Sequence, residues 1–171
     1  MTDEFPAAAR EAFGAHDAFE GGPDGYRLTT TVFEATVTAS ERDDYATDVT
    51  VRVDVPTLQS VTEDGQVGDA VQSGWLDTLE RRLEDAPKAT RASVELDDFG
   101  VTTENGVVTV TYEFAYGDAE RAADVAKTFV EYVEGTYVEG VVPGYDYGEP
   151  VTDLLSAAAT GEDDERGGTP L

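Results

Sequence analysis

A strand with one buried face is predicted where valines occupy every second position, namely Val49, Val51, Val53 and Val55. Successive side chains of a strand point to opposite faces, so alternation of apolar and polar residues is typical of a half-buried strand. Pro56 has no backbone N–H to donate to a neighbouring strand, and we expect the strand to close there.

The segment from Tyr26 to Ser40 also alternates, but its alternation changes phase. Its apolar residues occupy even positions up to Leu28 and odd positions from Phe33 onward. A strand cannot change phase without a turn or a bulge, so we expect one near Thr31 and Val32. The pattern leaves open whether this segment is one bulged strand or two.

Asn105 and Gly106 are the strongest turn signal in the chain. Both central residues of a type I′ hairpin turn need a positive φ angle, and these two residue types tolerate it. Pairing outward from this turn predicts two cross-strand pairs, Val101 with Val110 and Phe99 with Tyr112.

A bulge is expected at the start of the same hairpin. Carried further, the register would place Asp97 opposite Phe114, an acid facing an aromatic ring. One extra residue at Asp97 or Asp98 would restore apolar pairing. The restored pairs would be Leu96 with Phe114 and Val94 with Tyr116.

Apolar residues at spacings of three and four predict three helices, over residues 5–16, 67–86 and 118–137. The expected inward faces are Ala9, Phe13 and His16; then Val71, Trp75, Leu79 and Leu83, flanked by Ala70 and Leu76; then Ala122, Val125, Ala126, Phe129, Val133 and Tyr137. Asp118 is a good N-cap for the third helix. Glycines and prolines predict loops at Gly21 to Gly25 and at Gly140 to Pro150.

We expect a single domain over residues 1–159, with a short helix from residue 151, and a disordered acidic tail over residues 160–171. The element order is helix, two or three strands, helix, two strands, helix. Short separations favour antiparallel hairpins. The sequence therefore predicts an α+β fold, in which an antiparallel sheet of four or five strands has the helices of Trp75 and Phe129 packed on one face.

The chain is strongly acidic, with 37 Asp and Glu against 11 Lys and Arg and a formal net charge of -26. Nucleic acids and anionic membrane surfaces are bound through Lys and Arg, so this charge argues against both as partners. The N-terminus starts acidic and no apolar run reaches 18 residues, so we expect a cytoplasmic protein. The chain has no Cys and one His, which excludes disulfides, iron–sulfur clusters and His-pair zinc sites; we expect no metal and no cofactor.

The acidic residues are spread through all predicted elements rather than gathered in one patch. At multimolar salt the screening length falls to about 3 Å or less, and such a surface no longer repels itself, so we expect a halophilic cytoplasm.

With the stretches Tyr26–Ala35 and Gly140–Tyr145, the acidic, Cys-free chain resembles an uncharacterised domain family of halophilic archaea. That resemblance implies no known activity and no catalytic residues. The element order over residues 5–138 is also similar to type III secretion chaperones and YbjN-like domains, which implies protein binding and dimers.

Five residues are candidates for contact with a partner: Tyr137, Tyr145, Tyr147, Arg81 and Arg82. Tyrosines on a stiff loop bury large area at little entropic cost, and they serve equally to pin a loop onto the fold. Two adjacent arginines could dock an anionic group, or they could compensate a helix C-terminus and nearby carboxylates. For the tyrosines and for the arginines alike, the sequence leaves open whether they contact a partner or stabilise the fold.

The sequence contains no nucleophile elbow, Walker loop or dinucleotide-binding fingerprint. His16 could act as a general base, but we expect it to interact with the carbonyls that end the first helix.

The sequence favours a non-enzymatic protein-binding or chaperone-like module that offers an apolar sheet or helix face to another protein or to a second copy. The alternative is a carboxylate-dependent enzyme, such as a hydrolase, with no site residue nominated. A flat apolar patch would favour binding, and a deep pocket with buried carboxylates would favour the enzyme.

Overall fold

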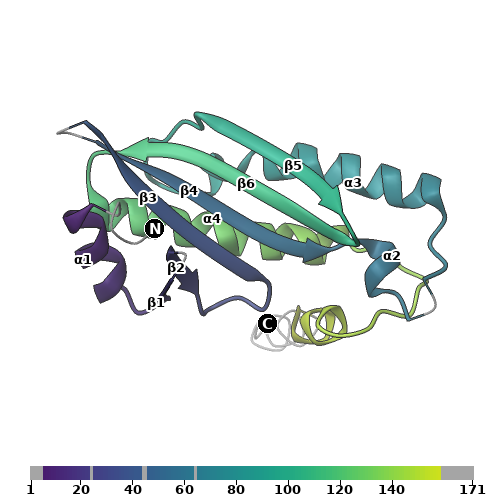
Figure 1. Cartoon of the computed structure of the whole chain (residues 1–171). Coiled ribbons are helices and arrows are strands. Elements are labelled where there is room, and N and C mark those ends of the chain that lie inside the picture. The colour runs from purple at the N-terminus through teal and green to yellow at the C-terminus, as the bar shows by residue number, and fades with distance from the viewer. Residues whose placement is uncertain (1–5, 24, 44–45, 64, 159–171) are drawn as a thin grey trace, which may run out of the picture.

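Six strands form one antiparallel sheet within residues 6–23, 25–43, 46–63 and 65–158, the part of the chain that this computed structural model describes (Figure 1). The strands lie in the order β1-β2-β3-β4-β6-β5. Their bounds are β1 Phe19–Gly22, β2 Gly25–Leu28, β3 Glu34–Asp43, β4 Ala46–Pro56, β5 Asp98–Glu104 and β6 Val107–Tyr116. The predicted α+β class and antiparallel sheet are confirmed, although the sheet has six strands where four or five were expected. The predicted tail, residues 160–171, lies outside the described residues.

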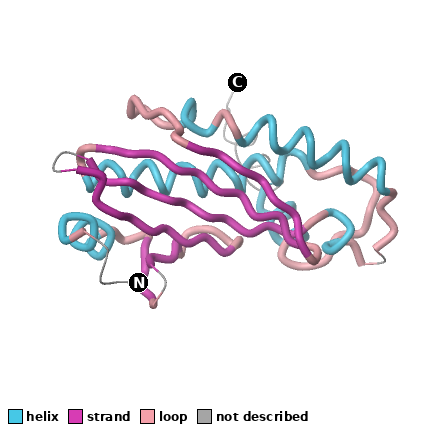
Figure 2. Tube along the Cα trace, turned by 45° about the horizontal axis from the view of Figure 1, so that its top comes forward, coloured by secondary structure: helices cyan, strands magenta, loops and turns pink. Residues whose placement is uncertain are grey.

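Helices α3 (Asp69–Leu83) and α4 (Ala119–Gly140) lie on the same face of the sheet (Figures 1 and 2). The Tyr112 hydroxyl on β6 donates a hydrogen bond of 2.7 Å to the carbonyl oxygen of Leu83 at the end of α3. Phe114 on β6 contacts Phe129 on α4, with 5.3 Å between ring centroids. The other helices are α1 (Ala7–Ala15), the single turn α2 (Leu58–Val61), the 3₁₀ helix η2 (Ala86–Ala89) and a helix over residues 151–158.

The covered face of the sheet is apolar and the uncovered face is polar. Alternate residues of β4 and β6 point into the core and are at most 1% exposed: Val49, Val51, Val53, Val55, Val108, Val110, Tyr112 and Phe114. Residues between them, such as Thr50, Thr109 and Thr111, are only partly buried. The strand predicted from alternating valines is thus confirmed as β4, and Pro56 is its last residue.

The segment from Tyr26 to Ser40 contains two strands. β2 ends at Leu28, β3 begins at Glu34, and the chain bends between them. The phase change expected near Thr31 and Val32 lies in this bend. The turn therefore settles the question that the sequence left open.

Three residues of the loop predicted from Gly21 to Gly25, namely Gly21, Gly22 and Gly25, lie in strands instead, whereas Pro23 lies in the turn between them and Asp24 is outside the described residues. The β1–β2 register pairs Gly22 with Gly25. Gly25 has a φ of 129°, and a Cβ placed on it would lie 2.5 Å from the carbonyl oxygen of Val37 on β3. The loop prediction is wrong because these glycines serve a tight hairpin and a close approach between strands.

The β5–β6 hairpin follows the predicted turn and register. Asn105 and Gly106 have φ angles of 53° and 80°, and the predicted pairs, Val101 with Val110 and Phe99 with Tyr112, both form. The predicted continuation is wrong. β5 begins at Asp98, and the pairs of Leu96 with Phe114 and of Val94 with Tyr116 do not form.

At residues 94–97 the chain diverges from β6, so these residues form no strand. The amide of Asp97 still donates to the carbonyl oxygen of Glu113, at 2.7 Å, although the pair opposite Glu113 is Asp98. Two residues thus face one, as in a bulge, but no strand resumes beyond it. Val94 and Leu96 instead pack, half-buried, against the edge of the core.

The predicted inward faces of the helices are largely confirmed. All six inward residues predicted for α4 are buried, and the Asp118 carboxylate caps the helix by accepting from the amides of Glu120 and Arg121. In α3, Trp75, Leu79 and Leu83 are buried, but Val71 is 38% exposed and Ala70 is exposed as well. Those two residues lie in the first turn of α3, before the part of the helix that packs against α4 and the core.

Candidate functional site

A pocket of about 250 Å³ lies between α3 and the C-terminal end of α4. Its α3 wall consists of Gly74, Trp75, Thr78, Leu79 and Arg82. Its other wall consists of Thr136 and Gly140 of α4 and Val142 of the following loop. We call this cavity the α3–α4 pocket. It brings together two stretches of sequence about 60 residues apart.

The α3–α4 pocket is open because two wall positions carry no side chain. Gly74 lies in the middle of α3 and Gly140 ends α4. A Cβ placed on either glycine would meet no atom within 4 Å. Glycine in a helix interior destabilises the helix by roughly 0.5–1 kcal/mol relative to alanine, so Gly74 costs stability while it keeps the pocket open.

Trp75 forms the buried part of the wall. It is 5% exposed, and its ring lies edge-on to that of Tyr137, with 5.7 Å between centroids. Its indole Nε1 is the one buried side-chain nitrogen or oxygen in the described chain that has no hydrogen-bond partner. An unpaired buried donor costs roughly 1–3 kcal/mol.

Arg82 provides positive charge at the rim of the pocket. Its guanidinium forms an ion pair with Glu139 of α4, and its carbonyl oxygen accepts a hydrogen bond of 2.7 Å from the Tyr132 hydroxyl. Arg81 is exposed and has no ion pair within the described residues. The predicted pair of arginines therefore lies at one end of α3, with one arginine on the pocket wall and the other next to it in sequence.

Tyr137 lies behind the pocket rather than on the surface. Its side chain is fully buried, and its hydroxyl donates a hydrogen bond of 2.9 Å to the carbonyl oxygen of Pro56 at the end of β4. Burial raises the pKa of its phenol far above the usual value for tyrosine, because the charged form would lose its hydration. Tyr137 thus holds Trp75 in place and ties α4 to the sheet.

Tyr145 and Tyr147 are both half-buried on the loop that follows α4. Their rings lie 6.4 Å apart, and the Tyr147 hydroxyl donates to the carbonyl oxygen of Val142, a residue of the pocket wall. Partial burial raises the pKa of Tyr147, and the nearby Tyr145 raises it further. The loop is also held to α2, because the amide of Gly148 donates to the carbonyl oxygen of Val61 at 2.7 Å.

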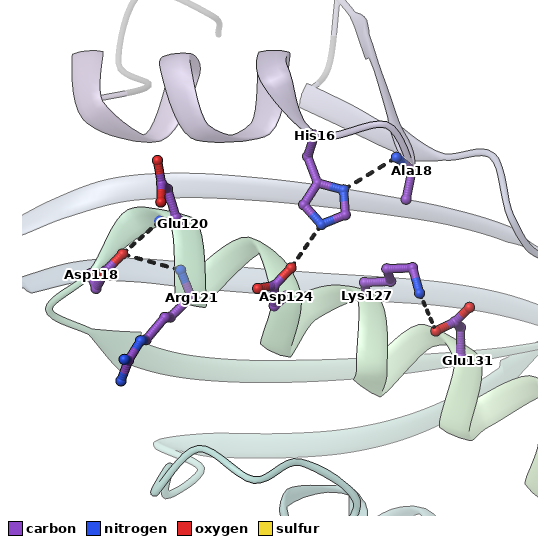
Figure 3. A network of polar contacts seen from close by, with 8 residues as sticks. All are labelled: His16, Ala18, Asp118, Glu120, Arg121, Asp124, Lys127 and Glu131. Carbon is purple, nitrogen blue, oxygen red and sulfur yellow. Dashed lines mark hydrogen bonds and ion pairs between the residues drawn. The ribbon is translucent and has the colours of Figure 1, made fainter.

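A second, wider groove of about 700 Å³ lies between α1 and the start of α4 (Figure 3). His16, at the end of α1, lines it together with four acidic residues, Glu11, Asp118, Glu120 and Asp124. The His16 Nε2 lies 2.8 Å from Asp124 Oδ1, and its Nδ1 accepts from the amide of Ala18 at 3.2 Å.

Both ring nitrogens of His16 are therefore engaged within the fold. Because Nδ1 accepts from a backbone amide, the neutral ring carries its proton on Nε2 and donates it to Asp124. No lone pair is left for a substrate, so this arrangement does not supply a general base. The expectation that His16 would contact the carbonyls ending α1 is wrong, because its side chain links α1 to α4 instead.

The described part of the chain has neither a pocket with buried carboxylates, which would favour an enzyme, nor a flat apolar patch, which would favour a binding module. The buried polar or charged residues there are three threonines, Thr57, Thr62 and Thr136, and no carboxylate is among them. No described cluster of three or more His, Asp and Glu residues has an arrangement that could hold a metal ion. The exposed large apolar residues of the described chain are Val32 in the bend between β2 and β3, Val71 on α3 and Val107 on β6, so they belong to separate segments.

Candidate residues of the α3–α4 pocket were partly accessible to sequence reasoning. Of its lining residues, the sequence indicates Arg82 as a partner contact but not Gly74, Thr78 or Gly140, and Tyr137 lies behind the pocket. Gly74 carries a usable signal, because glycine inside an otherwise regular amphipathic helix calls for a packing or functional reason.

The sequence pattern of a family of unknown function matches residues 14–157. That range includes the whole sheet, both long helices and the α3–α4 pocket. No curated protein and no solved structure matches the chain. Among the helices that the structure describes, none combines the length and apolar character needed to cross a membrane.

Proposed function

This chain belongs to the family of unknown function DUF5813, and we propose that it is a non-enzymatic module that binds another protein. The observation that carries the proposal is the α3–α4 pocket, a small cavity walled by Trp75 and Leu79 with an arginine at its rim. In this proposal the pocket takes one apolar side chain of the partner as an anchor. The broad apolar face expected from the sequence is replaced by a single cavity.

The size of the pocket favours an anchor side chain over a metabolite. Pockets for small molecules usually measure roughly 300–1,000 Å³, and about 250 Å³ is closer to the volume of one large apolar side chain. Burying such a side chain contributes about 1.5–3 kcal/mol, the scale of an interface hot spot. Thr78 and Arg82 would then belong to the polar rim that surrounds the anchor.

We also propose that the acidity of the chain is an adaptation to a halophilic cytoplasm. The described carboxylates lie at the surface, and the net charge is -26. In multimolar salt, charge pairs between proteins are screened, whereas burial of an apolar group is not weakened. An apolar anchor is therefore a suitable means of binding in that solvent.

The salt proposal is tested by thermal unfolding. We expect the melting temperature, followed by circular dichroism, to be much lower in about 0.1 M KCl than in about 3 M KCl, because dilute salt leaves the surface carboxylates unscreened. Equal melting temperatures in the two buffers would remove the argument for halophily and point to a cationic target.

The binding proposal is tested with a variant that fills the pocket and a matched control. Gly74→Leu places a side chain on the pocket wall, in space that is open in the wild type. Gly135→Leu makes the same change in the C-terminal part of α4, where glycine is exposed, has equal space and does not line the pocket. Each variant also gains helix propensity, so the two differ mainly in what they do to the cavity.

The three chains are used as baits for affinity capture from the native cytosol at native salt, with mass spectrometry of the bound proteins. We expect a partner that the wild type and Gly135→Leu retain, and whose recovery falls by about tenfold or more with Gly74→Leu. Trp75 is the only Trp, so its fluorescence should change when the purified partner is added. Capture of the same proteins by Gly74→Leu, or no enrichment by the wild type, would refute the proposal.

A further inference from the structure

The outer edge of β5 presents backbone groups that do not bond to another strand. β5 is the last strand of the sheet and forms its upper border in Figure 1. The two-residue turn makes Glu104 and Val107 a hydrogen-bonded pair, so alternate residues back to Asp98 bond to β6. The N–H and C=O groups of Phe99, Val101 and Thr103 therefore point away from the sheet.

One hydrogen bond supports this assignment directly. The amide of Phe99 donates to Oδ1 of Asp98, its own neighbour, at 3.0 Å rather than to β6. In the described chain, Val101 and Thr103 make no backbone hydrogen bond to any segment other than their own strand pair. A carboxylate on an edge N–H is one of the ways in which proteins protect a strand edge from unwanted pairing.

The opposite edge of the sheet is a weaker template. β1 has four residues and ends in two glycines, whereas β5 has seven. Gly100, in the middle of β5, has no atom within 4 Å of the position a Cβ would occupy, so the outer face of the strand is open there. Phe99 and Val101 point inward but stay half-buried at the edge.

We propose that β5 accepts an extended segment of a partner protein as a seventh strand. Backbone hydrogen bonds to Val101 and Thr103 would hold the segment, as in other cases of strand addition. Its inward side chains would be apolar, because they would complete the burial of Phe99 and Val101. Its outward side chains would be Lys or Arg, because the outer face beside this edge carries Asp98, Glu104 and, on β6, Glu113.

The same charges disfavour a second copy of this chain as the occupant. Two β5 strands paired about a two-fold axis at Val101 would place Asp98 of each copy opposite Glu104 of the other. Like charges directly opposite in a ladder are destabilising. Each copy also carries a net charge of -26.

The test uses a blocked seven-residue peptide of alternating Val and Lys, with a Val and Glu peptide for comparison. We expect the Val and Lys peptide to protect the amides of Val101 and Thr103 from hydrogen exchange. In about 0.15 M KCl it should bind better than the Glu peptide, and in about 2 M KCl that preference should shrink while the protection remains.

Two variants separate strand addition from simple attraction between opposite charges. Val101→Pro removes an outward N–H but leaves the bonds of Gly100 and Thr102 to β6, and should weaken binding by about tenfold or more. Val101→Thr keeps the N–H and should bind within about twofold of the wild type. If Val101→Pro fails to fold by circular dichroism, Thr103→Pro replaces it.

Equal binding by the proline variant, or protection elsewhere on the surface, would overturn the proposal in favour of non-specific attraction. Protection of the β5 amides without peptide, increasing with protein concentration, would overturn it in favour of a second copy. The proposal does not rest on the α3–α4 pocket. Gly74→Leu should bind the peptide normally, so either proposal can fail alone.

Discussion

Removing the hydroxyl of Tyr137 tests whether this residue is a structural tie between α4 and the sheet. Tyr137→Phe keeps the ring against Trp75 and deletes only the hydrogen bond of 2.9 Å to the carbonyl oxygen of Pro56. The side chain is fully buried, so water cannot replace the lost donor. Leaving a buried acceptor without this partner costs about 2 kcal/mol, which for a chain of this size lowers the melting temperature by about 4–8 °C.

The measurement is thermal unfolding by circular dichroism in about 2 M KCl, with urea unfolding as a second determination. Tyr145→Phe is the matched control, because Tyr145 is half-buried and its hydroxyl has no hydrogen bond within the described residues. The control should change the free energy of unfolding by less than about 0.5 kcal/mol. Partner capture by Tyr137→Phe should be unchanged, because the pocket wall is intact.

Two results would refute this reasoning. Equal melting temperatures for Tyr137→Phe and Tyr145→Phe would mean that the bond to Pro56 contributes nothing to stability. Loss of partner capture by a Tyr137→Phe chain that is still folded would mean that the hydroxyl acts in binding. Tyr137 would then return to the set of residues that contact a partner.

Three further predictions concern stability. Burial raises the pKa of Tyr112 and Tyr137 well above 10, so near and above that pH the unfolded chain loses protons that the folded chain keeps. The free energy of unfolding, measured with urea, should therefore fall between pH 9 and 11. The fall should be less steep when both tyrosines are replaced by Phe. Asp118→Ala should lower the free energy of urea unfolding by about 1 kcal/mol through loss of the α4 cap, whereas Asp118→Asn should keep most of it; equal losses would exclude capping. Gly25→Ala should destabilise the fold strongly through strain and a clash with a β3 carbonyl, whereas Gly135→Ala should raise the melting temperature slightly; a neutral Gly25→Ala would contradict the observed β2–β3 approach.

Elements with strong local signals were predictable from the sequence. β4 and α4 were found because each repeats one apolar period over several turns or alternations, and the β5–β6 register followed from a turn whose geometry only a few residue types tolerate. These signals involve residues close together in the sequence, so they can be interpreted without knowledge of the rest of the fold.

Elements whose shape depends on distant neighbours were missed. β1 has four residues, two of them glycine, and has no alternation to detect; its place depends on pairing with β2. Val71 was assigned to the core because periodicity identifies the face of a helix but not where along the helix its packing partner ends. The pairs expected past a bulge at Asp97 or Asp98 do not form, because apolar matching cannot show that a strand has left the sheet.

The candidate site was only partly predictable, for a related reason. The α3–α4 pocket depends on missing side chains at Gly74 and Gly140, and the absence of a side chain leaves no hydrophobic pattern. Local chemistry indicates Arg82 and Tyr137 as candidates, but the contact of Tyr137 with Trp75 and the place of Arg82 in the pocket lining follow from the packing of two helices.

The order of strands also bears on how the chain reaches its fold. β3 pairs with β4 and β5 with β6 as local hairpins, and these two units meet at a single seam, where Val53 lies opposite Val110. The segment between β4 and β5 is long and contains α2, α3 and η2, so bringing its ends together costs more entropy than closing either hairpin. We therefore expect docking of the two hairpins along β4 and β6 to be the step that sets the folding rate.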